Sequence, residues 1–169
     1  VALFSKYPII NSGEMVRQTI PRPYGKFYNR GVYADIETNG QMIRFVSVHL
    51  QSIYFASEDY NAIEEIKEET PSEISKFLPI IKKLGKAYKQ RGIQTAELKS
   101  FIEASPYPII LGGDFNDTPS SFAYQQLSEL LDDAFIKKGK GIGSTYNGSI
   151  PFLRIDYIFI DKTFSYSKY

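Results

Sequence analysis

The chain contains no cysteine and no tryptophan, and it has one histidine among its 169 residues. The lack of cysteine excludes a disulfide framework, a zinc site built on thiolates and a cysteine nucleophile. The formal net charge is +1, so the total charge gives no reason to expect nucleic acid or an anionic membrane as a partner. No apolar run approaches the roughly 20 residues of a membrane-spanning helix. The function must therefore be sought in local groups of residues.

The composition that is present is that of a folded globular protein. Hydrophobic residues make up 43% of the chain and aromatic residues 15%, and the many Phe and Tyr residues favour a sheet-rich core. A length of 169 residues fits one domain. Val1–Phe4 reads as the middle of a strand, and the chain stops soon after another strand. We therefore expect residues 1–169 to form a single domain that is incomplete at both ends.

The hydrophobic pattern predicts an α/β (α+β) fold with a largely antiparallel sheet. Asn39-Gly40 lies between two apolar runs and predicts a tight hairpin that pairs them antiparallel. The expected strands are Val1–Phe4, Val32–Glu37, Ile43–Leu50, Pro108–Gly112 and Ile155–Ile160.

Helices are expected within residues 58–104 and near residues 121–131. Thr70-Pro-Ser-Glu73 fits a helix start, because it combines an N-cap, a proline at the first helical position and a capping box. A kink or break in the helix that follows is predicted from Pro79, Gly85 and Gly92.

The segment Leu111-Gly-Gly-Asp-Phe-Asn-Asp-Thr118 holds the first candidate site. Asp114 and Asn116 stand two residues apart just beyond a buried strand, so both side chains can point into one cleft at the end of the sheet. In phosphoester hydrolysis an Asp can orient and deprotonate the attacking water, while an Asn amide holds the phosphate. The alternative is an Asx turn, in which both side chains only satisfy backbone amides.

Asp156 is the second candidate, because it is surrounded by apolar residues in Arg154-Ile-Asp-Tyr-Ile-Phe159. A carboxylate in an apolar strand needs a cation, a metal or an imidazole as its partner. Arg154 shares the same face of the predicted strand, so a structural ion pair between these two residues is the alternative to catalysis.

His49 is the third candidate and ends the Ile43–Leu50 strand. There it could donate a hydrogen bond to a phosphoryl oxygen or to a leaving group, or it could be a half-buried structural residue. Gln51 extends the same polar tip. Thr145 and Tyr146 could offer hydroxyls to a phosphate, or they could belong to a solvated loop.

Five motifs together resemble the endonuclease/exonuclease/phosphatase superfamily, in order and approximate spacing over nearly the whole chain. They are Phe4-Ser-Lys-Tyr-Pro-Ile9, Val48-His-Leu-Gln-Ser52, Arg91-x-x-Gln94, Gly112-Gly-Asp-Phe-Asn116 and Arg154-Ile-Asp-Tyr-Ile158. The resemblance implies a two-layer β-sandwich flanked by helices, as in deoxyribonuclease I, with the active site at one edge. It also implies hydrolysis of phosphoester bonds with Mg²⁺ or Mn²⁺ as cofactor.

The resemblance further implies a role for each candidate residue. Asp114 would align or deprotonate the attacking water and Asn116 would hold the scissile phosphate, and both would be secondary ligands of the metal. His49 resembles the histidine that contacts phosphate or leaving group in the deoxyribonuclease I and sphingomyelinase branches. Asp156 resembles the aspartate that orients a catalytic histidine. The expected substrate contacts are Gln51, Thr145, Tyr146 and Arg154.

The chain departs from the family pattern at both ends. The family's magnesium-binding glutamate and first asparagine precede the segment with which this chain begins, and its terminal Ser-Asp-His motif follows the segment with which it stops. We therefore expect the 169-residue chain alone to be weakly active or inactive, and a longer protein that carries it to be the enzyme. One alternative is a catalytically incomplete member that binds phosphorylated or nucleic-acid ligands. The other is a plain interaction domain in which these polar groups are structural.

The resemblance also bears on substrate and location. The motifs are closer to the sphingomyelinase-like, deoxyribonuclease-like and tyrosyl-DNA phosphodiesterase-like groups than to the inositol phosphatases. The expected partner is therefore a phosphoester substrate, namely a nucleic acid, a phospholipid or a small phosphodiester, and no protein partner is evident. The chain is also similar to bacterial members of Bacteroidetes type, some of which carry membrane helices ahead of the catalytic domain. Such helices would place the domain at the cell envelope.

Overall fold

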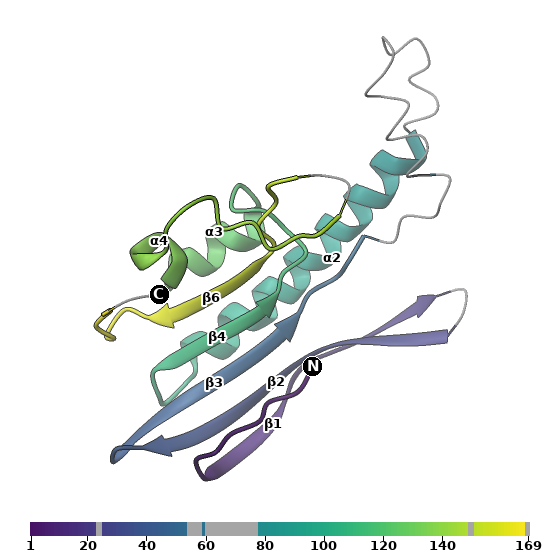
Figure 1. Cartoon of the computed structure of the whole chain (residues 1–169). Helices are drawn as coiled ribbons and strands as arrows, with labels where there is room; N and C mark the ends of the chain where they lie inside the picture. Colours follow the sequence, from purple (N-terminus) through teal and green to yellow (C-terminus); the bar gives the residue numbers. More distant parts are fainter. Residues whose placement is uncertain (23–24, 54–58, 60–77, 149–150, 168–169) are drawn as a thin grey trace.

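The computed structural model describes residues 1–22, 25–53, 59, 78–148 and 151–167. Within these residues, six strands form one mixed sheet in the order β1-β2-β3-β4-β6-β5 (Figure 1). The neighbours β3 and β4 run parallel, and the other neighbouring pairs run antiparallel. The expected α+β class and the largely antiparallel sheet are confirmed, whereas the described residues form one sheet and not the two layers of the expected β-sandwich.

The first three strands follow one another along the chain and pair in that order, whereas helices precede each later strand and bring β4 and β6 beside strands that are distant in sequence. The strands are β1 Ile9–Arg22, β2 Gly25–Thr38, β3 Gln41–His49, β4 Ile109–Asp114, β5 Leu131–Asp133 and β6 Asp156–Asp161. The described helices are α2 Leu78–Glu103, α3 Phe122–Ser128 and α4 Ala134–Lys138.

The turn between β2 and β3 has the geometry that its sequence predicts. Asn39 and Gly40 have φ angles of 51° and 74°, and positive φ at both central residues is what a two-residue type I′ hairpin requires. The strands then pair antiparallel from Thr38 opposite Gln41 to Gly31 opposite Val48. This hairpin sets the register of β3 and so determines where His49 lies.

The helix α2 is continuous from Leu78 to Glu103, so the predicted break is wrong. Gly85 and Gly92 are tolerated because packing against the sheet outweighs a weak local preference. The helix start predicted at Thr70 lies outside the described residues.

Among the residues that are described, no helix is both long and apolar enough to cross a membrane.

The core lies between the sheet and its covering helices. Val46 and Val48 of β3 and Leu111 of β4 are buried there. Leu98 of α2 and Leu127 of α3 pack into the same cluster. Because successive side chains of a strand point to opposite faces, the residue that follows Val48 points away from the helices. That residue is His49.

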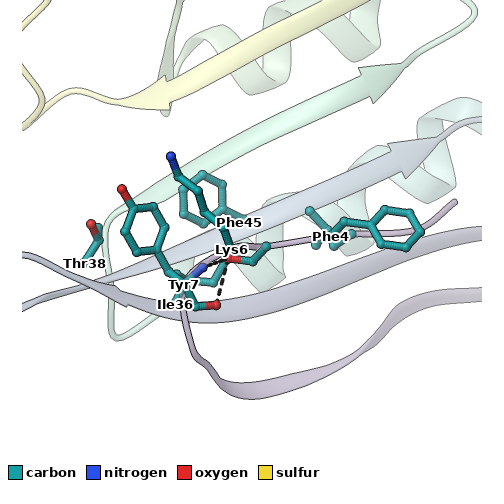
Figure 2. Close-up of a pocket in the computed structure, with 8 residues that line it drawn as sticks. Phe4, Lys6, Tyr7, Ile36, Thr38 and Phe45 are labelled. Atoms are coloured by element: carbon teal, nitrogen blue, oxygen red, sulfur yellow. Dashed lines mark hydrogen bonds between the residues drawn. The ribbon is translucent and has the colours of Figure 1, made fainter.

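The first eight residues form no strand, so the strand predicted at Val1–Phe4 is wrong. A strand needs a neighbour for its backbone hydrogen bonds, and the sheet edge beside β2 is already occupied by β1. Residues 3–7 instead cross the sheet face opposite the helices (Figure 2). There they enclose a hollow of about 280 Å³ together with Ile36, Thr38 and Phe45.

Candidate functional site

Three neighbouring strands bring the candidate side chains to one edge of the sheet. His49 is the last residue of β3, Asp114 is the last residue of β4, and Asp156 is the first residue of β6. The strand registers place His49 beside Asp114 and Asp114 beside Asp156. Two of these residues were expected at strand ends, but only the sheet order shows that all three lie next to one another.

His49 and Asp114 face each other across the two parallel strands. The distance from His49 Nε2 to Asp114 Oδ2 is 3.7 Å, which is too long for a direct hydrogen bond. The side chains are 50% and 32% exposed, respectively, so both can be reached from solvent. A phosphate oxygen or a water molecule can therefore contact both groups.

Asp114 and Asn116 also form the Asx turn that was the alternative interpretation. Asp114 Oδ1 accepts a hydrogen bond of 2.7 Å from the Asn116 backbone N–H, and Asn116 adopts a positive φ of 51°. The Asn116 Nδ2 donates to the Leu50 carbonyl at 3.1 Å. The turn uses one carboxylate oxygen of Asp114 and leaves the other beside His49. The structural and the catalytic interpretation are therefore compatible.

Burial raises the pKa of the Asp114 carboxyl above its ordinary value of 3.8, and the nearby Asp156 carboxylate raises it further. The hydrogen bond from the Asn116 backbone N–H and the charges of His49 and Arg91 favour the charged form but do not reverse the shift. The negative charge of Asp156 thus disfavours ionisation of Asp114 and favours a cation or a proton at the Asp114 carboxyl. A carboxyl with a raised pKa is also a stronger base once it is ionised.

We predict from this shift that Asp114→Asn stabilises the fold at neutral pH. A carboxyl whose pKa is raised on folding binds its proton more tightly in the folded state, so ionisation opposes folding above the folded-state pKa. Below the unfolded-state value of about 3.8 both states are protonated and the cost vanishes. The midpoint of thermal unfolding should rise in Asp114→Asn at pH 7, and the gain should shrink as the pH falls to 4. A gain that grows towards acidic pH would contradict the assigned shift.

The predicted ion pair between Arg154 and Asp156 is wrong. Arg154 Nη1 donates to Asp133 Oδ2 at 2.7 Å, and both side chains are buried. The guanidinium also lies over the rings of Phe135 and Tyr157. The reason is that β6 begins only at Asp156, so Arg154 precedes the strand and does not share its alternation. The role of Arg154 as a substrate contact stays a prediction.

Thr145 lies beside Asp156 and holds the start of β6. Its Oγ1 accepts hydrogen bonds from the backbone N–H groups of Ile155 and Asp156 at 3.0 and 3.1 Å. The backbone N–H groups of Thr145 and Tyr146 both donate to the Leu153 carbonyl. The loop that carries both predicted substrate contacts is thus fastened next to the site. Whether these residues contact substrate stays a prediction, and the same holds for Gln51.

From the sequence alone, no structural role was predicted for the helix residues that hold the loops of the site in place. Arg91 and Gln94 of α2 are completely buried and bond to the segment after β3. Arg91 also pairs with Asp117, which follows Asn116. Burial raises the pKa of Asp117, although the guanidinium of Arg91 beside it favours the charged form. The Arg91-x-x-Gln94 motif was visible in the sequence, but its partners lie 26 to 43 residues away and only the fold identifies them.

The candidate site does not contain a complete set of protein ligands for a metal ion among the described residues. In the portion of the chain that the structure describes, no group of three or more His, Asp or Glu side chains converges to hold a metal ion. The polar groups at the strand ends number one imidazole, two carboxylates and one amide. This set can bind and polarise a phosphate and can take a proton from water.

Several solved structures share this fold. A protein of the endonuclease/exonuclease/phosphatase family from Bacteroides thetaiotaomicron matches with a TM-score of 0.61 and 18% identity, over 94% of this chain and 52% of that chain. Sphingomyelinase C from Streptomyces griseocarneus matches with a TM-score of 0.59 and 16% identity, over 94% and 51%. Beta toxin of Staphylococcus aureus, with bound magnesium ions, matches with a TM-score of 0.57 and 20% identity, over 97% and 53%.

These likenesses show the fold, and the chain spans about half the length of the structures it matches. No curated protein matches the sequence. The family profile described as "Endonuclease/Exonuclease/phosphatase family" matches residues 1–168, which is almost the whole chain. One of these neighbours is named a sphingomyelinase, and a further structure of the same fold, from Bacteroides thetaiotaomicron, is named a mannosyl-6-phosphatase. The chain therefore belongs to the endonuclease/exonuclease/phosphatase family.

Proposed function

We propose that the protein carrying this chain is a metal-dependent hydrolase of phosphoester bonds, and that its reaction takes place at the shared end of β3, β4 and β6. The observation that carries this proposal is the convergence of His49, Asp114 and Asp156 on three neighbouring strands in a chain of this family. Burial and the neighbouring Asp156 carboxylate both oppose ionisation of Asp114, and a bound cation would offset this cost.

Asp114 acts on the attacking water in this proposal. Its Oδ2 is free of the Asx turn and lies on the side of His49, so it can accept a proton from a water molecule placed between them. Its raised pKa makes it a better base than an ordinary aspartate. His49 donates a hydrogen bond to a phosphoryl oxygen or to the leaving group, which a half-exposed imidazole at a strand end can do.

Asn116 and Asp156 position the substrate and the neighbouring groups. One N–H of the Asn116 amide is used by the Leu50 carbonyl, which leaves the second N–H for the scissile phosphate. Asp156 orients a catalytic histidine, as the family resemblance implies. The backbone N–H of Asp156 is itself held by the Thr145 hydroxyl. The hydroxyls of Thr145 and Tyr146, with Gln51 and Arg154, are the proposed outer substrate contacts.

The carboxylates at these strand ends would supply some of the ligands of a magnesium or manganese ion, and waters and substrate would supply the others. Asp114 and Asp156 repel each other, which a cation would relieve. Mg²⁺ in such sites is usually held by one or two carboxylates together with waters and substrate phosphate, and so needs no complete protein cage. Asp114 and Asn116, with Asp156 beside them, would hold the ion. When bound it neutralises negative charge on the phosphate.

The second candidate function is a phosphate- or nucleic-acid-binding module without catalysis. One observation favours it: among the described residues no group of three or more His, Asp or Glu side chains is arranged so that it could hold a metal ion. Such a module would bind inorganic phosphate through His49 and Asn116 and would release no product from any ester.

The experiment that tests the proposal compares hydrolysis of a diester, bis(p-nitrophenyl) phosphate, with that of a monoester, p-nitrophenyl phosphate. Both are measured with Mg²⁺ and with EDTA, for this chain and for a form extended at both ends. We expect metal-dependent cleavage of the diester by the extended form and weak or no cleavage by the chain alone. If neither ester is cleaved by either form while inorganic phosphate still binds, the enzyme proposal fails and the binding module is correct.

A further inference from the structure

One fully buried arginine joins the two loops that carry the candidate residues. The Arg91 guanidinium donates from Nε to Asp117 Oδ2 at 2.8 Å and from Nη1 to the Gln51 carbonyl at 2.9 Å. The side chains of Arg91 and Asp117 are 1% and 5% exposed. Gln94, one turn further along α2, accepts a hydrogen bond of 2.9 Å from the Gln51 backbone N–H. Both backbone groups of Gln51 are thus fixed by α2.

The two loops held in this way are adjacent to the proposed reacting groups. Gln51 is two residues after His49, and Asp117 is one residue after Asn116. The loops also touch each other directly, because the Asn116 amide donates to the Leu50 carbonyl. The loop after β4 is also held by β6, because the Tyr157 hydroxyl donates to the Asp117 carbonyl at 2.8 Å. A shift of the guanidinium would therefore move His49 and Asn116 relative to each other.

The buried polar side chains Arg91, Gln94 and Asp117 are not the residues that would give the most stable fold. Three side-chain atoms on this face of α2 are buried and have no hydrogen-bond partner among the residues that the structure describes, namely Arg91 Nη2, Gln94 Nε2 and Thr95 Oγ1. Buried polar atoms without partners destabilise a fold. Apolar side chains of similar volume often replace a buried ion pair without loss of stability. What apolar side chains cannot supply is the directed hydrogen bonds to Gln51 and Asp117.

We propose that Arg91 is a positioning residue for the hydrolysis, and that it acts with Asp117 and Gln94 by locking the loop after β3 to the loop after β4. The inference rests on the proposed function and deepens it. Arg91 touches neither His49 nor Asn116 in this account and acts only through the backbone that carries them.

The test replaces the buried ion pair by an apolar pair, Arg91→Met with Asp117→Leu. The matched control is Arg44→Met with Asp35→Leu, because Arg44 and Asp35 form a similarly buried pair at 2.6 Å. Arg44 lies five residues before His49 on the same strand, about 16 Å from the site. We expect both double variants to unfold at temperatures close to the parent. In the active form of the protein the 91/117 variant should lose about 100-fold in kcat with little change in KM, and the control should keep its rate.

A second readout does not depend on catalysis. His49 is the only histidine of the chain, so the ring signals of its imidazole in an NMR spectrum need no assignment. The 91/117 double variant removes one positive and one negative charge together, so its net charge is unchanged. We expect the His49 ring signals to shift and broaden in this variant, and to stay in place in the 44/35 control.

If the 91/117 variant fails to fold, Gln94→Leu supplies the same test by removing only the acceptor of the Gln51 N–H, with Thr95→Val as its neighbour control. Unchanged kcat and unchanged His49 signals in a folded 91/117 or Gln94→Leu variant would overturn the inference. Equal losses in variant and control would overturn it too, because they would reflect general destabilisation. If the parent hydrolyses no ester, the proposed function fails, but the His49 signals still decide whether Arg91 positions the loops.

Discussion

Gly113→Ala is expected to lower the free energy of unfolding by about 2–5 kcal/mol, as the sum of overpacking and backbone strain. A Cβ atom at this position would lie 1.9 Å from the Val48 carbonyl oxygen and 2.9 Å from the Val48 carbonyl carbon and backbone nitrogen. These are backbone atoms of the neighbouring strand, so no side chain can rotate away. Gly113 also has a φ of 149°, which side-chain-bearing residues rarely adopt. A urea unfolding curve measures the loss.

Gly112→Ala is the matched control for that substitution. At Gly112 the nearest atom to an added Cβ is the Tyr157 carbonyl oxygen at 3.7 Å, which is an ordinary contact. Its φ is not positive, so alanine fits the local backbone. We expect its free energy of unfolding to stay within about 1 kcal/mol of the parent. Equal losses at Gly112 and Gly113 would contradict the close approach of β3 and β4 that brings His49 beside Asp114.

Much of the sheet could be predicted from the sequence because its signals are local. Apolar runs flanked by turn residues gave four of the strands, and Asn39-Gly40 gave the hairpin with the correct backbone geometry. The failures depend on partners elsewhere in the chain. Val1–Phe4 has strand composition but no strand to pair with, and the short β5 exists only because β6 offers it an edge. The glycines of α2 are tolerated because the helix packs on the sheet.

In the candidate site, too, local sequence signals predict some features and only the fold shows the others. The positions of His49, Asp114 and Asn116 at strand ends follow from composition and turn chemistry. The partner of Arg154 does not, because Asp133 lies 21 residues away and the alternation used to pair Arg154 with Asp156 begins only at Asp156. The buried pair of Arg91 and Asp117 was likewise outside the reach of local reasoning. Buried polar pairs form between distant segments, so only the fold shows which residues meet.

Asp114→Asn is expected to lower kcat by about 10²–10⁴-fold, the usual contribution of a positioned general base. The substitution keeps the size of the side chain and an oxygen that can accept the Asn116 N–H, so the Asx turn survives. It removes the carboxylate that would take the proton from water. KM should change much less than kcat, because Asn116 and His49 remain to contact the phosphate.

Asp161→Asn is the control for that variant. Asp161 stands at the opposite end of β6 from Asp156, and its carboxylate accepts hydrogen bonds from Thr163. Its replacement also removes one negative charge, but far from the strand ends at which the reaction is proposed. The rate should stay within about twofold of the parent, as expected for a surface substitution away from special features.

The most direct test of the account is the rate of Mg²⁺-dependent cleavage of bis(p-nitrophenyl) phosphate by the extended form of the protein, measured side by side for the parent, Asp114→Asn and Asp161→Asn. We predict a rate that EDTA abolishes, that falls by about 10²–10⁴-fold in Asp114→Asn and that persists in Asp161→Asn. A rate in Asp114→Asn equal to that of the parent would contradict this prediction, because the proposed site at the ends of β3, β4 and β6 would then not be where the ester is cleaved.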